Sequence, residues 1–528
     1  MADFLLEIGV EEIPDWMIGP ALEHLKNQVA ELIVPLHGSV TFAEATPRRL
    51  AILASGLALH TAEKTVTVSG PPVGAADKAI EGFAKKNGVT RDALQEINGK
   101  WSHVVVQPGV AAAHHLAAQL PAIILGIPWP KTMYWLGKGT ERFIRPLRWL
   151  VCLLGDDVVE FNVAGVWTGR ESWGRRDGPR IPKAVVTTAN YAATLAHSGV
   201  LLSGEERKQR ILGEAAKLLP PGTQLKSDDA LLATLAGITE YPTPILGSFE
   251  ESYLKLPAEV LVTVMRHHQK YFSVETAEGK LAPHFVAVMN THADPDGLVR
   301  HGNERVLRAR FNDARFFYDT DQKKPLRDRV ADLANVTFQA QLGSYLAKTE
   351  RVVALVTELG GSAEAQEAAR LAKTDLTTEM VKEFTELQGQ IGGLYAEAQG
   401  HSRAVGRAIY EHYKPVSMED TVPSTVEGQI LSLADKVDTL RGCFRIGMIP
   451  KGSSDPFALR RAAQGVVKIL VEGQLTLTVP QLTAGDPALE GFLRDRVDYY
   501  FREIRGFGYD EVNAVLAAGW TDLKDVLA

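Results

Sequence analysis

Hydrophobic and polar positions alternate in two different patterns along the chain. Up to about residue 320, short runs rich in Val, Ile and Phe alternate with helical stretches, and Gly, Pro or Asp stands near most of their ends. The runs that predict strands are Phe4 to Val10, His103 to Gln107, Val158 to Val163, Ala184 to Thr188 and Phe285 to Met289. This part of the sequence predicts mixed α/β structure in two subdomains.

From Asn303 onward, helical patterns dominate and runs typical of strands become scarce. In the first helix of this part, one face is formed by residues at helical spacing: Leu307, Phe311, Ala314 and Tyr318. Arg305 and Arg308 point away from that face, and Arg315 lies at its edge. The sequence therefore predicts a helix that carries arginines on an outward flank.

Further helical patterns cover Leu342 to Leu359, Ala363 to Glu386, Ser402 to Tyr413 and Val426 to Cys443. Another helix is expected to begin at Asp455-Pro456, because Asp is a good N-cap and Pro suits the first helical position. The stretch from Pro480 to Pro487 is typical of a linker. A last helical unit is expected from Ala488.

Composition places the chain among globular proteins. Its 528 residues, 45% of them hydrophobic and 23% charged, are enough for several domains and a large core. No stretch has the ~20 consecutive apolar residues that a membrane-spanning helix needs, and acidic residues occupy the place of a signal peptide's basic region. We therefore expect a cytoplasmic protein. The net charge of −7 argues against a chain that coats nucleic acid everywhere, but it leaves room for local basic surfaces.

Several catalytic motifs are absent from the sequence. The two cysteines, Cys152 and Cys443, support neither a disulfide framework nor a thiolate zinc cluster. No phosphate-binding P-loop, zinc-protease helix or serine-hydrolase elbow occurs. We accordingly expect no catalytic residue, metal or cofactor in this chain.

Basic residues gather in four segments, and arginine both pairs with phosphate and stacks on bases. The candidates for nucleic-acid contact are Arg142, Arg145 and Arg148; Arg175 and Arg176, within a basic stretch from Arg170 to Arg180; Arg305, Arg308 and Arg315; and Lys451, Arg460 and Arg461. The alternative for any single segment is a solvated surface. For the first segment, the alternative is a helix cap with solvated arginines. For the third segment, the arginines would instead pair within the chain with Glu304, Asp313 or Asp319.

Asp435 and Asp438 stand three residues apart on a largely apolar helix, so both carboxylates lie on one side. Such a pair either holds a divalent cation or accepts hydrogen bonds from nearby basic groups. Because a buried carboxylate is costly unless it is satisfied, a structural network is the favoured interpretation.

Seven segments resemble the beta subunit of bacterial glycyl-tRNA synthetase. They are Leu6 to Pro14, Thr46 to Leu50, Gly302 to Arg310, Asp313 to Phe317, Glu383 to Gly389, Ala434 to Leu440 and Asp455 to Ala463. They occur in order over most of the chain. The resemblance implies a heterotetramer of two alpha and two beta subunits, in which the alpha subunit carries the active site for ATP, Mg and glycine. The beta subunit then binds and positions tRNA(Gly).

The resemblance also implies a multidomain α+β fold. Residues 1–322 would resemble the editing-domain-like module of phenylalanyl-tRNA synthetase beta subunits, and residues 323–480 an HD phosphohydrolase domain. Residues 481–528 would be a linker and the first helices of an anticodon-binding domain that is longer in the family. The HD positions match Thr374, Asp375, Asp435 and Asp438, without the usual histidine ligands. An active HD-type metal-dependent phosphohydrolase is the alternative function, and an editing deacylase is a third.

Overall fold

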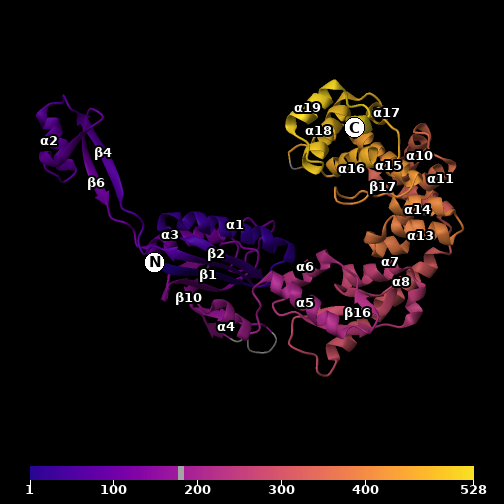
Figure 1. Ribbon diagram of the computed structural model, residues 1–528, viewed down its shortest axis with the longest axis horizontal. Helices are drawn as coiled ribbons and strands as arrows, with labels where there is room; N and C mark the ends of the chain where they lie inside the picture. Colours follow the sequence, from indigo (N-terminus) through magenta and orange to yellow (C-terminus); the bar gives the residue numbers. More distant parts are fainter. Residues whose placement is uncertain (177–182, 453, 528) are drawn as a thin grey trace. The chain divides into compact units, whose positions relative to one another are not determined.

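The computed structural model describes residues 1–176, 183–452 and 454–527, which fold as two compact units. Unit 1 comprises residues 1–247, 270–280 and 285–301. Unit 2 comprises residues 248–269, 281–284 and 302–528. The chain is thus mixed α+β, with a sheet-rich N-terminal part and a helical C-terminal part (Figure 1). No helix in the described part of the chain combines the length and apolar character needed to cross a bilayer.

Unit 1 is built on a seven-stranded sheet with the order β2-β3-β1-β7-β10-β9 and β8 paired to β7. Its strands are β1 Ala2–Val10, β2 Ser39–Thr46, β3 Arg49–Leu57, β7 Leu147–Leu154, β8 Asp157–Val158, β9 Asn162–Val163 and β10 Val166–Gly169. All neighbours are antiparallel except β10 and β7. The central strands β1 and β7 are buried, which explains their nearly continuous hydrophobic sequences.

Helices cover both faces of this sheet (Figure 1). Helices α1 (Asp15–Ile33) and α3 (Ala112–Leu125) pack against Leu6 and Ile8 on one face. Helix α4 (Tyr191–His197) packs against the face of Leu5. Gly9 lies on the Leu5 face, since side chains alternate along a strand. A Cβ atom there would lie 2.0 Å from Cδ2 of Trp149, so this close approach requires glycine.

The remaining elements of unit 1 form smaller layers. Between β3 and α3, strands β4 (Lys64–Pro72), β5 (Leu94–Ile97) and β6 (Lys100–Gln107) form a separate sheet, on which α2 (Asp77–Lys86) packs with its own small core. The other elements are β11 Glu171–Trp173, β12 Lys183–Val185, α5 Gly204–Leu218, β13 Thr223–Leu225, α6 Asp229–Ile238, β14 Thr243–Ser248, β15 Phe272–Thr276 and β16 Leu281–Met289, of which residues 248 and 281–284 are assigned to unit 2. The last four strands form a sheet in the order β13-β15-β16-β14.

Unit 2 is mostly helical. Its helices are α7 Ala258–Thr263, α8 Leu298–Asp321 from residue 302 onward, α9 Leu326–Arg329, α10 Tyr345–Glu358, α11 Ala363–Leu371, α12 Glu379–Glu383, α13 Gln390–Ala398, α14 Arg403–Glu411, α15 Val426–Arg445, α16 Leu459–Glu472, α17 Val479–Thr483, α18 Pro487–Tyr499, α19 Tyr509–Ala518 and α20 Leu523–Leu527. Strands β17 (Thr337–Gln339) and β18 (Gly343–Ser344) form a short hairpin. Single helical turns η1 to η8 connect elements of both units: Val34–Leu36, Arg91–Ala93, Glu251–Lys255, Val264–Gln269, Ala331–Asn335, Thr374–Thr377, Thr385–Leu387 and Tyr500–Ile504.

Three expected elements are wrong in detail. The helix expected over 363–386 is broken into α11, η6, α12 and η7. Thr374 Oγ1 donates to the carbonyl of Leu371 at 2.6 Å, and Thr378 caps α12, so threonine hydroxyls compete with the helical backbone. The expected strand over 158–163 is split into β8 and β9. The first basic segment, Arg142 to Arg148, is no helix cap, because it leads directly into strand β7.

Proline accounts for two further corrections. The expected linker over 480–487 contains α17 and the start of α18, because proline is tolerated in the first turn of a helix. Asp455 does accept hydrogen bonds from the backbone N–H groups of Leu459 and Arg460, at 2.8 and 2.9 Å. However, α16 begins at Leu459, so Pro456 precedes the helix rather than opening it.

Candidate nucleic-acid interface

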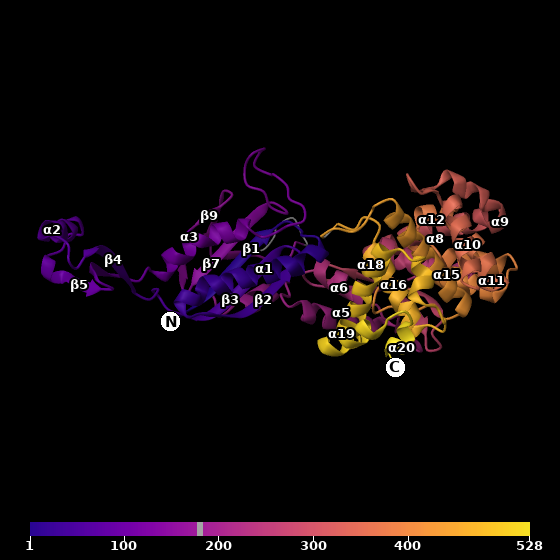
Figure 2. The same ribbon diagram turned by 90° about the horizontal axis from the view of Figure 1, so that it is seen from above.

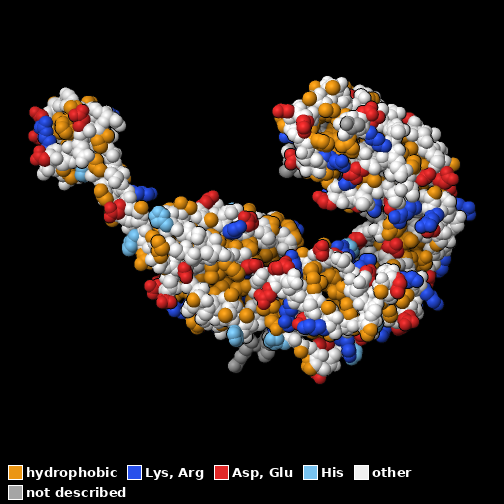
Figure 3. Space-filling view, viewed as in Figure 1, with side chains coloured by type: hydrophobic (Ala, Val, Ile, Leu, Met, Phe, Trp, Pro, Cys, Tyr) orange, Lys and Arg blue, Asp and Glu red, His pale blue; other side chains and the backbone are white. Residues whose placement is uncertain are grey.

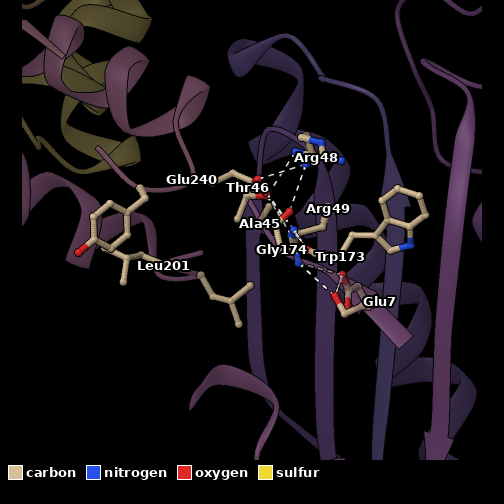
Figure 4. A network of polar contacts seen from close by, with 12 residues as sticks. Glu7, Ala45, Thr46, Arg48, Arg49, Trp173, Gly174, Leu201 and Glu240 are labelled. Atoms are coloured by element: carbon tan, nitrogen blue, oxygen red, sulfur yellow. Dashed lines mark hydrogen bonds and ion pairs between the residues drawn. The ribbon is translucent and has the colours of Figure 1, made fainter. Parts of the chain in front are cut away.

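A buried polar network occupies the sheet of unit 1 where the first two family-like segments meet (Figure 4). Arg49 on β3 lies between two carboxylates: its Nη1 is 3.1 Å from Glu7 on β1, and its Nη2 is 3.0 Å from Glu240. All three side chains are fully buried. Burial lowers the pKa of Arg49, but Glu240 and Glu7 outweigh it and hold that pKa above its usual value. These charges are therefore paired with one another inside the unit.

Two candidate arginines share one surface carboxylate. Arg148 and Arg176, separated in sequence, both bind Glu11, at 2.7 and 3.0 Å. Burial raises the pKa of Glu11, but Arg148, Arg176 and Arg48 outweigh this effect and lower it overall. About half of each of the two arginine side chains is exposed, so the cluster still presents positive charge to solvent. Arg142 is also exposed, and Arg145 is half-buried.

Arg175 lies in a different environment from its neighbour Arg176. It is 2% exposed, and its guanidinium carbon lies 5.1 Å from the ring centroid of Tyr241. Arg175 is therefore a core residue rather than part of an exposed basic surface. Arg180, from the same basic stretch, lies outside the described residues.

Helix α8 carries its arginines as the periodicity predicts. Leu307, Phe311 and Ala314 are fully buried, Tyr318 is half-buried, and Arg305 and Arg308 are exposed. Arg308 pairs with Glu250 at 3.5 Å rather than with the three partners considered from the sequence, and both side chains remain more than half exposed. Arg315 stacks on Tyr253, 4.2 Å from the ring centroid. The flank is therefore a positive surface on a fixed helix.

The fourth basic segment lies at the start of α16. Lys451 and Arg461 are exposed, whereas Arg460 donates to the carbonyl of Gly452 at 2.7 Å. Arg461 lines a cavity of about 310 Å³ together with Asp435 and Lys436. Burial lowers the pKa of Lys436 to about 7, and its ammonium donates to the carbonyl of Lys414 at 2.9 Å.

The carboxylates of α15 lie in a network of basic side chains, which we call the Asp435 network: Lys348, Arg351, Lys373, His412, Asp435 and Asp438. One carboxylate oxygen of Asp435 is 3.1 Å from the Lys348 ammonium, and the other is 3.0 Å from that of Lys373. Lys348 also reaches Asp438 at 3.1 Å, and Arg351 binds Asp438 at 2.7 Å. The acidic pair is thus satisfied by basic groups of the chain itself.

Protonation states within the Asp435 network follow from its geometry. Burial raises the pKa of Asp435, but Lys348 and Lys373 outweigh it and hold that pKa well below its usual range. Burial, with Lys373 beside it, lowers the pKa of His412 to about 3, so the ring is neutral. Its Nδ1 lies 2.5 Å from the carbonyl of Ile409 and must donate there, so Nε2 accepts from Lys373 at 2.9 Å. The Lys373 ammonium therefore lies between the His412 imidazole and the Asp435 carboxylate.

The remaining two HD positions are buried as well. Asp375 accepts a hydrogen bond from the backbone N–H of Gly389 at 2.5 Å, and burial raises its pKa to about 6. Thr374 hydrogen-bonds to the backbone. In the part of the chain that the structure describes, no three His, Cys, Asp or Glu side chains are arranged to hold a metal ion. The sequence did not identify Lys348, Lys373 or Arg351 as partners, although Lys373 directly precedes the Thr374-Asp375 pair.

Within each unit, the candidate basic residues lie on separate elements of the chain. Arg148 and Arg176 are joined through a common partner, Glu11. On the face drawn in Figure 3, Lys and Arg side chains alternate with Asp and Glu and do not cover the surface. This distribution suits a surface that contacts a polyanion at several separate points.

Comparison with known proteins covers nearly the whole chain. Residues 4–517 match a family model described as glycyl-tRNA synthetase beta subunit. The glycine–tRNA ligase beta subunit of Acidobacterium capsulatum is 46% identical over all of this chain and 81% of its own length. The beta subunit of Phenylobacterium zucineum is 42% identical over all of this chain and 80% of its own length. That of Desulforamulus reducens is 38% identical over 99% of this chain and 81% of its own length. The chain belongs to the family of beta subunits of glycine–tRNA ligase, an aminoacyl-tRNA synthetase.

Proposed function

We propose that this chain binds and positions tRNA(Gly) for ATP-dependent glycylation at the active site of a separate alpha subunit, in an assembly of two alpha and two beta subunits. The observation that carries the proposal is the family match over residues 4–517. ATP and Mg would be bound by the alpha subunit. The isolated chain would form no glycyl-adenylate.

The charge distribution supports this role. Arg142, Arg148 and Arg176 in unit 1 and Arg305, Arg308 and Arg461 in unit 2 keep exposed guanidinium groups. Phosphate contacts fix the position and orientation of a nucleic acid without reading its sequence, so separate arginines are sufficient. By contrast, the carboxylates of the Asp435 network are already neutralised by Lys348 and Lys373. No observation favours the phosphohydrolase alternative.

The domain names belong to the same proposal. Unit 1 would contain the editing-domain-like module, the helices around the Asp435 network would form a degenerate HD domain, and the helices after residue 480 would begin an anticodon-binding domain. The burial of Thr374, Asp375 and Asp435 supports the second of these assignments, because these are the positions that match the HD motif.

The test is direct binding of fluorescently labelled tRNA(Gly) to the full chain over a series of salt concentrations. Each phosphate contact contributes ~0.7–0.9 to the slope of log affinity against log salt, so several contacts predict a steep slope. A non-cognate tRNA serves as the comparison. Absence of binding at low salt would contradict the proposal.

A further inference from the structure

Residues 126–146, between α3 and β7, form an irregular loop that extends from the sheet of unit 1 as a long purple segment in Figure 2. Its two limbs pair at one point: the N–H of Met133 donates to the carbonyl of Phe143 at 2.8 Å, and that of Phe143 donates back at 3.3 Å. At the tip, the Thr140 hydroxyl donates to the carbonyl of Gly137 at 2.8 Å. Residues 131–142 are called the 131–142 hairpin below.

The base of the 131–142 hairpin is anchored in the core of unit 1. Phe143 is fully buried and Ile144 nearly so. The rings of Trp129 and Phe143 meet edge to face with centroids 5.3 Å apart, and Trp135 packs against the same core. Because this base is already held in place, binding a ligand would cost less conformational entropy in the hairpin than in a loop without such support.

The outer part of the hairpin exposes large apolar side chains. Met133, Tyr134 and Leu136 are 39%, 41% and 53% exposed, although they lie within four positions of one another. The guanidinium carbon of Arg142 lies 5.0 Å from the ring centroid of Tyr134. Single exposed hydrophobic residues are ordinary, but a group beside a cation–π pair is typical of a binding surface.

The hairpin is also positively charged. Lys131, Lys138 and Arg142 stand against a single acidic residue, Glu141, in a chain whose net charge is −7. Among the ion pairs formed between described residues, none involves these three basic side chains, whereas Arg148 just beyond them is paired with Glu11. Their charges remain available to an anionic ligand.

We propose that the 131–142 hairpin binds unpaired nucleotides of the tRNA, with a base stacked on Tyr134 and phosphates beside Lys131 and Lys138. This inference rests on the proposed function. Exposed aromatic rings combined with basic side chains are the features that bind single strands. A base inside an RNA helix is already stacked, so an aromatic side chain can stack only on a base outside the paired regions.

The experiment measures binding of the full chain to labelled tRNA(Gly), to a 12-nucleotide single-stranded RNA and to the same RNA paired with its complement. Because one stacked base is worth about 1–3 kcal/mol, and about 1.4 kcal/mol is tenfold in affinity, Tyr134→Ala should weaken binding of tRNA(Gly) and of the single strand by ~5–150-fold. Its salt slope should stay unchanged, and duplex binding should not fall. Tyr134→Phe keeps the ring and should bind as the wild type does.

Two further variants separate stacking from charge. Trp167→Ala removes a 69% exposed aromatic on β10, outside the hairpin, and should leave all three affinities unchanged. Lys131→Ala with Lys138→Ala should lower the salt slope for the single strand by ~1.4, since each contact contributes ~0.7.

The outcomes distinguish the hairpin from the wider function. Failure of the wild-type chain to bind tRNA(Gly) would overturn the proposed function and this inference together. Normal wild-type binding with an unchanged Tyr134→Ala variant would overturn the hairpin alone. If Tyr134→Ala instead weakens association with a purified alpha subunit and leaves RNA binding intact, the hairpin is a protein interface and the proposal is wrong.

Discussion

At the scale of single residues, the buried charges of the two networks are paired inside the chain, whereas the exposed arginines keep guanidinium groups that solvent can reach. Arg49 lies between Glu7 and Glu240, and Asp435 between Lys348 and Lys373. Removing one partner of a buried pair costs about 3–5 kcal/mol, because the other charge stays buried. An exposed pair such as Arg308 with Glu250 contributes only about 0–1 kcal/mol. This difference decides which arginines can be replaced without loss of stability.

Asp435→Asn tests this assignment. The variant keeps the shape of the side chain but leaves the buried Lys373 ammonium without a carboxylate, whereas Lys348 keeps Asp438. The free energy of unfolding should therefore fall by about 3–5 kcal/mol in urea titrations. Asp313→Asn, at an exposed position on α8, should change it by less than about 0.5 kcal/mol. A loss below about 1 kcal/mol for Asp435→Asn would show that the network contributes little to stability.

Asp375 should make stability depend on pH. Burial raises its pKa from 3.8 to about 6, so the native state holds this proton more tightly than the unfolded chain does. The resulting stabilisation is complete below about pH 4 and is lost as the pH rises through about 6. At ~1.4 kcal/mol per pKa unit, this stabilisation amounts to about 3 kcal/mol. Between about pH 4 and pH 6, the wild type should therefore lose about 3 kcal/mol of stability relative to Asp375→Asn, as measured by the free energy of unfolding of each. A difference that stays constant with pH would contradict the assignment.

Gly9 and Gly19 differ in the space that surrounds them. Gly9→Ala would place a Cβ atom into the ring of Trp149, which stacks on Trp173 with centroids 5.6 Å apart. We expect a loss of about 1–3 kcal/mol in stability and an altered tryptophan fluorescence spectrum. Gly19→Ala, in helix α1 with open space around it, should instead stabilise the protein by about 0.5–1 kcal/mol. Equal effects of the two variants would refute the packing argument.

At the scale of elements, hydrophobic periodicity predicted β1 and the buried face of α8 well, because both depend on side-chain spacing within one element. Phe4 to Val10 falls within β1, and Leu307, Phe311 and Ala314 are buried. The break of the helix after Leu371 was not predictable from spacing, since it depends on threonine hydroxyls that bind local carbonyls. The partners of Asp435 were missed for a different reason: Lys348 and Lys373 are 87 and 62 residues away in sequence.

The outward flank of α8 carries a prediction about tRNA. Arg305→Ala with Arg308→Ala should weaken tRNA(Gly) binding and lower the slope of log affinity against log salt by about 1.4–1.8, for two phosphate contacts. The melting temperature should stay nearly unchanged, because the pair with Glu250 is exposed. Glu250→Gln breaks that pair while keeping both arginines, so its binding should not weaken. A melting temperature several degrees lower with the original salt slope would show that these arginines stabilise the fold and do not contact tRNA.

At the scale of the whole molecule, the chain combines a sheet-rich unit and a helical unit, each with its own buried polar network and its own exposed basic residues. The proposed function would account for this combination, since a subunit that positions tRNA would need stable surfaces that carry basic residues. Binding and chemistry would then reside in different subunits.

The most direct test of this division is a glycylation assay with tRNA(Gly), glycine and ATP, using a matching alpha subunit alone, this chain alone, and the two together. We predict glycyl-tRNA only in the combined reaction. For this chain alone we also predict no glycine-dependent exchange of pyrophosphate into ATP. Exchange by the pure chain, or full glycylation by the alpha subunit without it, would contradict the account.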